Sequence, residues 1–117
     1  MDRPVIPTLP TDSPAEHFQN ATLRPVVKGM HRTLVDLFLH FAAKRKFYPE
    51  QTPKVKRREK IKELITRDNR LRGLLFGVVI GHFEPEELSY YLENEGETNR
   101  RITNLLLERI LDALAKN

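Results

Sequence analysis

Histidine and carboxylate side chains at helical spacing are the first candidates for chemistry, because helical bundles hold metals through Glu-x-x-His pairs on facing helices. The 117-residue sequence contains no such pair. His31 and His40 lie nine residues apart and do not share a helix face closely, while Asp36 and His40 form one isolated i,i+4 pair. His82 follows an apolar run, where a surface or helix-end position is expected. We therefore predict no metal site and no cofactor.

The densest polar cluster outside the basic segment combines Glu93, Glu95 and Glu97 with Arg100 and Arg101. One interpretation is a carboxylate site whose arginines bind an anion. The other is an acid-rich helix N-terminus whose arginines reach back to the glutamates, and the sequence favours this second interpretation. No catalytic residue is assigned here.

Nucleophilic catalysis and phosphate-loop binding find no support either. The chain has no cysteine and no Gly-x-Ser-x-Gly motif, and serine occurs only at Ser13 and Ser89. In residues 71–83 the positions between the glycines are apolar, and this pattern favours helix packing over a phosphate-binding loop. We therefore predict that the protein is not an enzyme.

Residues 71–83 form the most apolar run in the chain, and glycine recurs there at every fourth position, as Gly73, Gly77 and Gly81. A helix that is apolar nearly all round is expected to be buried, and a glycine face lets another backbone come close. About a dozen residues is too short for a bilayer, which needs roughly 20. The sequence predicts a central helix that its neighbours clasp.

Other helices are expected around it, at about residues 23–46, 52–67 and 84–93, with a last helix that begins near Asn94. The last helix carries one apolar face around Leu106 and a second stripe beside it, made of Leu107, Leu111 and Leu114. So wide an apolar surface predicts two packing partners, one inside the fold and one outside it. No strand pattern or repeat is present, so we predict an all-α fold, a compact bundle of about five helices.

Residues 1–20 are predicted to form an extended arm that precedes a single helical domain at 21–117. Pro4, Pro7 and Pro10 recur at the three-residue period of polyproline II. Such an arm is either loose or laid along a neighbouring subunit. Because no signal peptide or membrane-spanning run is seen, we expect a cytoplasmic protein without a membrane partner.

Charge is segregated along the chain. Residues 44–72 carry twelve Lys and Arg against four Asp and Glu, a net charge of +8, whereas residues 84–97 carry six glutamates and no basic residue. The two segments could neutralise each other within one molecule or between two copies, and pairing within one molecule is the favoured expectation.

The basic segment is also a candidate for nucleic-acid binding. The residues that would contact phosphates are Lys54, Lys56, Arg57, Arg58, Lys60 and Arg67. A helix-turn-helix interpretation fails, because the helix in the recognition position is apolar and has no polar face to offer base edges. Aromatic residues for base stacking are limited to Phe47 and Tyr48.

Three stretches carry a resemblance to a known group of proteins: residues 18–25 (FQNATLRP), 71–81 (LRGLLFGVVIG) and 91–102 (YLENEGETNRRI). They resemble a family of short uncharacterised all-helical bacterial proteins, some of which carry the name glyoxalase. Glyoxalases of the common type are similar to paired βαβββ modules with His and Glu metal ligands on strands, and this chain has neither. The resemblance implies a compact helical domain and supplies no functional residue.

These observations favour a non-enzymatic protein-interaction module that self-associates as a homodimer and has a protein partner that the sequence does not identify. Its interface and packing residues would be Gly73, Gly77, Gly81, Leu107, Leu111 and Leu114. The alternative is a nucleic-acid-binding protein that uses residues 54–72 for phosphate contacts.

Overall fold

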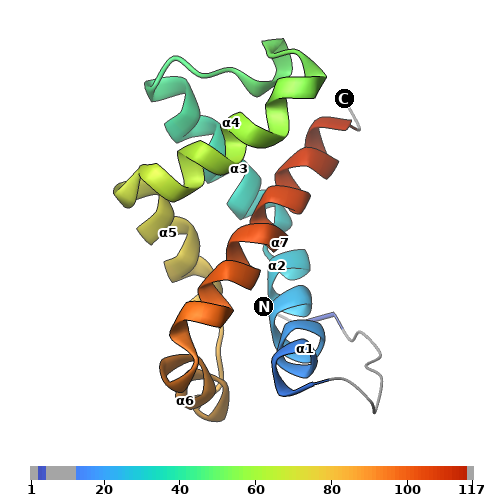
Figure 1. The fold of residues 1–117 in the computed structure, drawn as a ribbon, viewed down its shortest axis with the longest axis vertical. Helices are drawn as coiled ribbons and strands as arrows, with labels where there is room; N and C mark the ends of the chain where they lie inside the picture. Colours follow the sequence, from blue (N-terminus) through green and yellow to red (C-terminus); the bar gives the residue numbers. More distant parts are fainter. Residues whose placement is uncertain (1–2, 5–12, 116–117) are drawn as a thin grey trace.

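The computed structural model describes residues 3–4 and 13–115, and these residues form an all-α fold without strands (Figure 1). The prediction of a compact helical bundle is confirmed. The helices follow one another as α1 (Pro14–Phe18), the π-helical turn η1 (Gln19–Leu23), α2 (Arg24–Gly29), α3 (His31–Lys44), the 3-10 turn η2 (Pro49–Gln51), α4 (Lys54–Arg67), α5 (Asn69–Ile80), α6 (Pro85–Glu93) and α7 (Glu95–Ala115).

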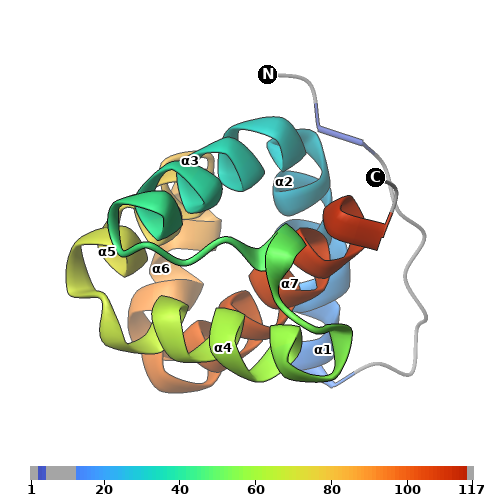
Figure 2. The same ribbon diagram turned by 90° about the horizontal axis from the view of Figure 1, so that it is seen from above.

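The helix at the centre of the bundle is α7 rather than the glycine-containing α5. It packs against α2, α3, α4, α6 and η1. Figure 2 shows α7 enclosed between α4 on one side and α2 and α3 on the other. Its 21 residues bury side chains on more than one face: Ile102, Leu106 and Ile110 lie on one, and Leu107 and Leu114 lie beside it. The wide apolar surface of α7 is therefore what draws the other helices together.

The helix α5 packs on one side only. Leu71, Leu75 and Val79 recur every fourth residue and are fully buried, facing α3 and α4. Gly73 and Gly77 are exposed, and a Cβ atom placed on either would have no neighbour within 4 Å. The prediction that other helices clasp the glycine face is wrong within this chain, because the buried side chains of α5, Phe76 among them, lie away from Gly73 and Gly77.

Gly77→Ala is expected to raise the free energy of unfolding by about 0.5–1 kcal/mol, because alanine favours an exposed helix interior over glycine. Urea unfolding measures the change. Gly81→Ala is the matched control: its Cβ would lie 2.9 Å from the Gly77 carbonyl oxygen, so no gain is expected there. A loss of stability in Gly77→Ala at low protein concentration, where the protein is monomeric, would mean that its own chain covers this face.

The stripe of Leu107, Leu111 and Leu114 belongs to the core. Leu107 and Leu114 are buried and Leu111 is partly buried against the same cluster. The prediction that this stripe is free for a partner is wrong, because α7 has neighbours in the same chain on more than one of its faces. The packing role of these residues is internal to the fold.

The predicted extended arm ends earlier than residue 20, because Pro14–Phe18 and Gln19–Leu23 are helical. Ser13 caps α1 by accepting a hydrogen bond from the Glu16 amide at 3.2 Å, and Pro14 occupies the first turn, where its missing N–H costs little. Phe18 then anchors the segment by stacking on Tyr90, with 4.4 Å between ring centroids. Pro7 and Pro10 lie outside the described residues.

The helix predicted over residues 23–46 is interrupted at Met30, whose φ of −105° and ψ of 19° separate α2 from α3. The helix α3 ends close to the predicted position. Lys46 adopts a left-handed φ of 57°, and the Phe47 amide donates to the Ala42 carbonyl oxygen at 2.9 Å. This pattern is a Schellman-type end, which normally favours glycine at the left-handed position.

Candidate interaction surfaces and the α2–α7 groove

The outer face of α4 forms the basic end of the molecule. Ile61 and Ile65 are fully buried and hold α4 against the core, so the charged residues between them face solvent. The exposed lysines that make no side-chain hydrogen bond or ion pair with described residues are Lys54, Lys56, Lys60 and Lys62. These ammonium groups are available to an external anion.

The arginines of α4 are occupied by the protein itself. Arg57 donates to the Thr52 carbonyl oxygen at 2.9 Å, Arg58 binds Glu108 at 2.9 Å, and Arg67 binds Glu63 at 3.3 Å. The six residues predicted as anion contacts therefore divide by type. The lysines make no such contact with the described residues, whereas each arginine is paired: Arg57 with the preceding loop, Arg58 with α7 and Arg67 within α4 itself.

The acidic end comprises α6 and the start of α7. Glu87 accepts a hydrogen bond from the Glu84 amide at 2.7 Å, which completes a capping box at the N-terminus of α6. Glu97 binds Arg100 at 2.7 Å and Arg101 at 2.9 Å, and these hydrogen bonds lower the pKa of Glu97. The arginines reach back to the acidic helix start as expected. Glu86 and Glu93 are exposed and make no such contact.

The basic and acidic ends lie apart. Figure 1 shows α4 near one end of the long axis, which measures 41 Å, and α6 near the other. Among the described residues, no ion pair joins residues 44–72 to residues 84–97. The favoured expectation that the two segments pair within one molecule is therefore not met among the described residues. α4 and α6 lie at opposite ends, and where the segments approach each other, at Arg72 and Glu95 beside Tyr91, no ion pair forms.

Exposed apolar side chains occur on α5 and α6. Leu74 is 40% exposed and Leu92 is 63% exposed, and Leu88 is exposed as well. The helical spacing of Leu88, Tyr91 and Leu92 predicts that all three face the core from α6. Only Tyr91 is buried there. The Tyr91 hydroxyl donates to the Asn99 side chain at 2.7 Å, and burial, with the nearby Glu95 carboxylate, raises the pKa of Tyr91.

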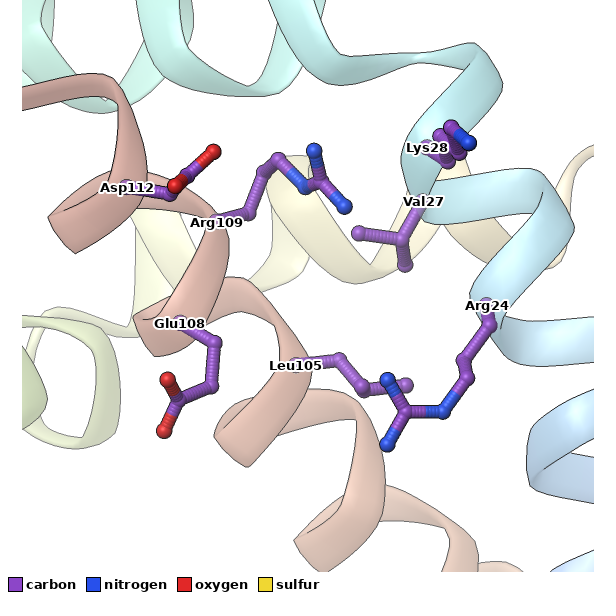
Figure 3. Close-up of a pocket in the computed structure, with 7 residues that line it drawn as sticks. All are labelled: Arg24, Val27, Lys28, Leu105, Glu108, Arg109 and Asp112. Atoms are coloured by element: carbon purple, nitrogen blue, oxygen red, sulfur yellow. The ribbon is translucent and has the colours of Figure 1, made fainter. Parts of the chain in front are cut away.

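A groove of about 340 Å³ runs between α2 and α7 (Figure 3). Val27 and Leu105 are buried and form its apolar floor. Its charged lining comprises Arg24 and Lys28 from α2, and Glu108, Arg109 and Asp112 from α7. The spacing explains the arrangement, because Arg24 and Lys28 lie one turn apart beside Val27, and Arg109 lies one turn after Leu105.

No sequence motif marks the groove. Arg24 and Arg109 lie far apart in the chain, and each reads locally as an ordinary surface arginine. A local signal does exist: basic residues flank an apolar position at helical spacing on both helices. It becomes a site only once α2 and α7 are known to be neighbours.

The histidines do not converge. The Nδ1 atom of His82 lies 2.7 Å from the Val78 carbonyl oxygen at the end of α5, and the His40 ring packs edge-on to Phe41. In the part of the chain that the structure describes, no three His, Asp or Glu residues are grouped as metal ligands would be.

Comparison of the chain with protein families, curated proteins and solved structures found no match. Within residues 13–115, no helix is both long and apolar enough to cross a membrane. The fold defines the protein as a small all-α bundle.

Proposed function

We propose that the protein is a non-enzymatic interaction module that self-associates as a homodimer. The observation that carries the proposal is the separation of opposite charges at the two ends of the molecule, without ion pairs between them among the described residues. In an antiparallel dimer the basic end of one copy meets the acidic end of the other, and the symmetry satisfies both ends at once. Complementary charge of this kind speeds association and fixes the orientation of partners.

The open face of α5 supplies an apolar centre for such an interface. Leu74 is exposed there between Gly73 and Gly77, and the open space above both glycines lets a second molecule approach the backbone. Leu88 and Leu92 of α6 add exposed apolar surface. Interfaces usually combine an apolar core with a polar rim, and a stable one buries about 1,200–2,000 Å². The proposed interface therefore uses α5 and excludes the buried leucines of α7.

Sedimentation velocity at several salt concentrations tests the proposal. We expect a dimer at high micromolar concentration that weakens as salt rises, because salt screens charges beyond a Debye length of about 10 Å at 0.1 M. The double variant Lys56→Glu with Lys60→Glu should weaken the dimer about tenfold or more. Arg32→Glu is the matched control, since Arg32 is exposed on α3, outside the basic end.

A charge-swap mixture sharpens the test. The variant Glu86→Lys with Glu93→Lys reverses the acidic end, so mixing it with the Lys56→Glu/Lys60→Glu variant should yield heterodimers while each variant alone dissociates. A monodisperse monomer at high micromolar concentration in both low and high salt would overturn the homodimer.

Nucleic-acid binding by the basic end is the second candidate. The free ammonium groups of Lys54, Lys56, Lys60 and Lys62 favour it, together with the exposed ring of Tyr48 on the preceding loop. Phosphate contacts of this kind give affinity that falls steeply with salt and does not depend on sequence. Binding to single- and double-stranded DNA that is lost in Lys56→Glu/Lys60→Glu, with the dimer unaffected, would select this candidate. Unchanged DNA affinity in that variant would exclude it.

A further inference from the structure

We infer that the groove between α2 and α7 binds a small organic anion, a phosphate ester or a carboxylate that carries an apolar body. The inference is independent of the proposed self-association, because the groove residues lie outside α4, α5 and α6. It rests on guanidinium groups from two facing helices and on an apolar floor between them. Both features are visible in Figure 3.

The anionic head group would meet Arg24 and Arg109. In Figure 3 the Arg109 guanidinium reaches from α7 toward Val27, and the Arg24 guanidinium reaches from α2 toward Leu105. Arg24 uses its Nε–H to bind the Asn20 side chain at 3.0 Å, which orients the guanidinium and leaves its terminal N–H groups for a ligand. Arg109 is half-buried and makes no hydrogen bond or ion pair with the described residues. Planar guanidinium groups suit phosphate and carboxylate because they donate two parallel hydrogen bonds.

The carboxylates of the groove do not cancel this field. Glu108 is already bound by Arg58 of α4 at 2.9 Å, so its charge is compensated from outside the groove. Figure 3 shows the Glu108 and Asp112 carboxylates farther from α2 than the guanidinium group of Arg109. Lys28 adds a further cation one turn beyond Arg24. The wall nearest α2 is therefore positive.

The apolar body would lie on Val27 and Leu105. Both side chains belong to the buried core, so the floor is fixed by packing and is not assembled on binding. A volume of about 340 Å³ suits a small molecule, since ligand sites usually span about 300–1,000 Å³. An anion with an aromatic ring should therefore bind more tightly than the bare inorganic ion.

NMR titration of the 117-residue protein tests the inference, with phenyl phosphate, benzoate and inorganic phosphate as separate probes. We expect phenyl phosphate or benzoate to shift the methyl signals of Val27 and Leu105 and the Nε–H signals of Arg24 and Arg109. Inorganic phosphate should bind more weakly at the same place. The relative affinities of phenyl phosphate and benzoate then show which head group the arginines prefer.

The variant Arg109→Gln should weaken binding of the preferred probe about tenfold, because it removes a charge-assisted contact. Arg32→Gln on α3 is the matched control and should bind as the native protein does. Arg24→Gln gives a second variant on an exposed helix position if Arg109→Gln impairs folding. Shifts confined to the α4 lysines, equal affinity for inorganic phosphate, or no effect of either groove variant would overturn the inference.

Discussion

Leu107→Ala is expected to lower the free energy of unfolding by about 2–5 kcal/mol, the range for a large aliphatic side chain deleted from a close-packed core. Leu107 is 1% exposed and belongs to the same buried cluster as Leu106 and Ile110. Truncation removes its apolar contacts and leaves a cavity that α7, held by neighbours along its length, closes only in part. Urea unfolding at low protein concentration isolates this effect from self-association.

Leu92→Ala is the matched control for the same chemical change. Leu92 is 63% exposed on α6, so its truncation should alter the free energy of unfolding by no more than about 0.5 kcal/mol. If Leu107→Ala left stability unchanged and instead abolished the dimer, the stripe on α7 would be an interface after all. If both variants were equally destabilised at this low concentration, Leu92 would be packed within its own chain.

The two wrong predictions, a covered glycine face on α5 and a free apolar stripe on α7, have one physical cause. Helical periodicity reports how wide an apolar face is, but it does not report how many neighbours cover that face. The wide face of α7 looked larger than the fold needed, yet α2, α3 and α4 cover it. The face of α5 looked closed because of Gly73 and Gly77, yet it lies open. Which helix has the more neighbours depends on tertiary arrangement, which local spacing does not encode.

Helix boundaries can be predicted from the sequence more reliably than helix contacts, because capping interactions join residues that are close in sequence. Pro85 with acidic residues behind it predicts the start of α6, and the structure adds the capping box between Glu84 and Glu87. The start of the apolar run predicts a cap at Asp68 or Asn69, and Asp68 caps α5 by accepting from the Leu71 amide at 3.1 Å. The missed helix α1 carried a signal of the same kind in Ser13 and Pro14, but the proline period of the preceding residues outweighed it.

Contacts between distant residues were beyond sequence reasoning. Arg3 binds Glu87 through two hydrogen bonds of 2.8 Å each, and it also donates to the His82 carbonyl oxygen. The two residues are 84 positions apart, and no local pattern around either one predicts the contact. This contact holds Arg3 against the start of α6 of its own chain. At this residue the arm is therefore neither loose nor laid on a neighbouring subunit.

Glu87→Gln is expected to lower the free energy of unfolding by about 1.5–3 kcal/mol, because hydrogen bonds to a charged group are worth about that much. The Glu87 side chain is only 19% exposed and accepts from Arg3, from the Thr22 hydroxyl at 2.8 Å and from the Glu84 amide. A neutral amide has one acceptor oxygen, so it loses part of this set and leaves the Arg3 charge without its partner. Glu86→Gln is the control, since Glu86 is an exposed neighbour on the same helix.

The pH dependence of stability distinguishes this charge effect from a loss of packing. Burial alone would raise the pKa of Glu87, but the hydrogen bonds from Arg3, the Glu84 amide and Thr22 outweigh it and lower the pKa. Arg3 stays charged throughout, because its pKa is raised by the hydrogen bond to Glu87. A carboxylate with a lowered folded-state pKa stabilises the protein above its unfolded pKa, about 4.3 for glutamate, and this stabilisation is lost as the pH falls through the folded pKa.

The native protein should therefore lose stability more steeply below about pH 4 than Glu87→Gln does, and the difference between the two should shrink as the carboxyl protonates. Urea unfolding of both proteins at neutral pH and at successively lower pH measures it. Arg3→Gln removes the same contact from the other side and should flatten the profile in the same direction, without altering the capping box of α6. A stability difference that stayed constant from neutral to acid pH would show that Glu87 acts through packing and that the ion pair contributes nothing.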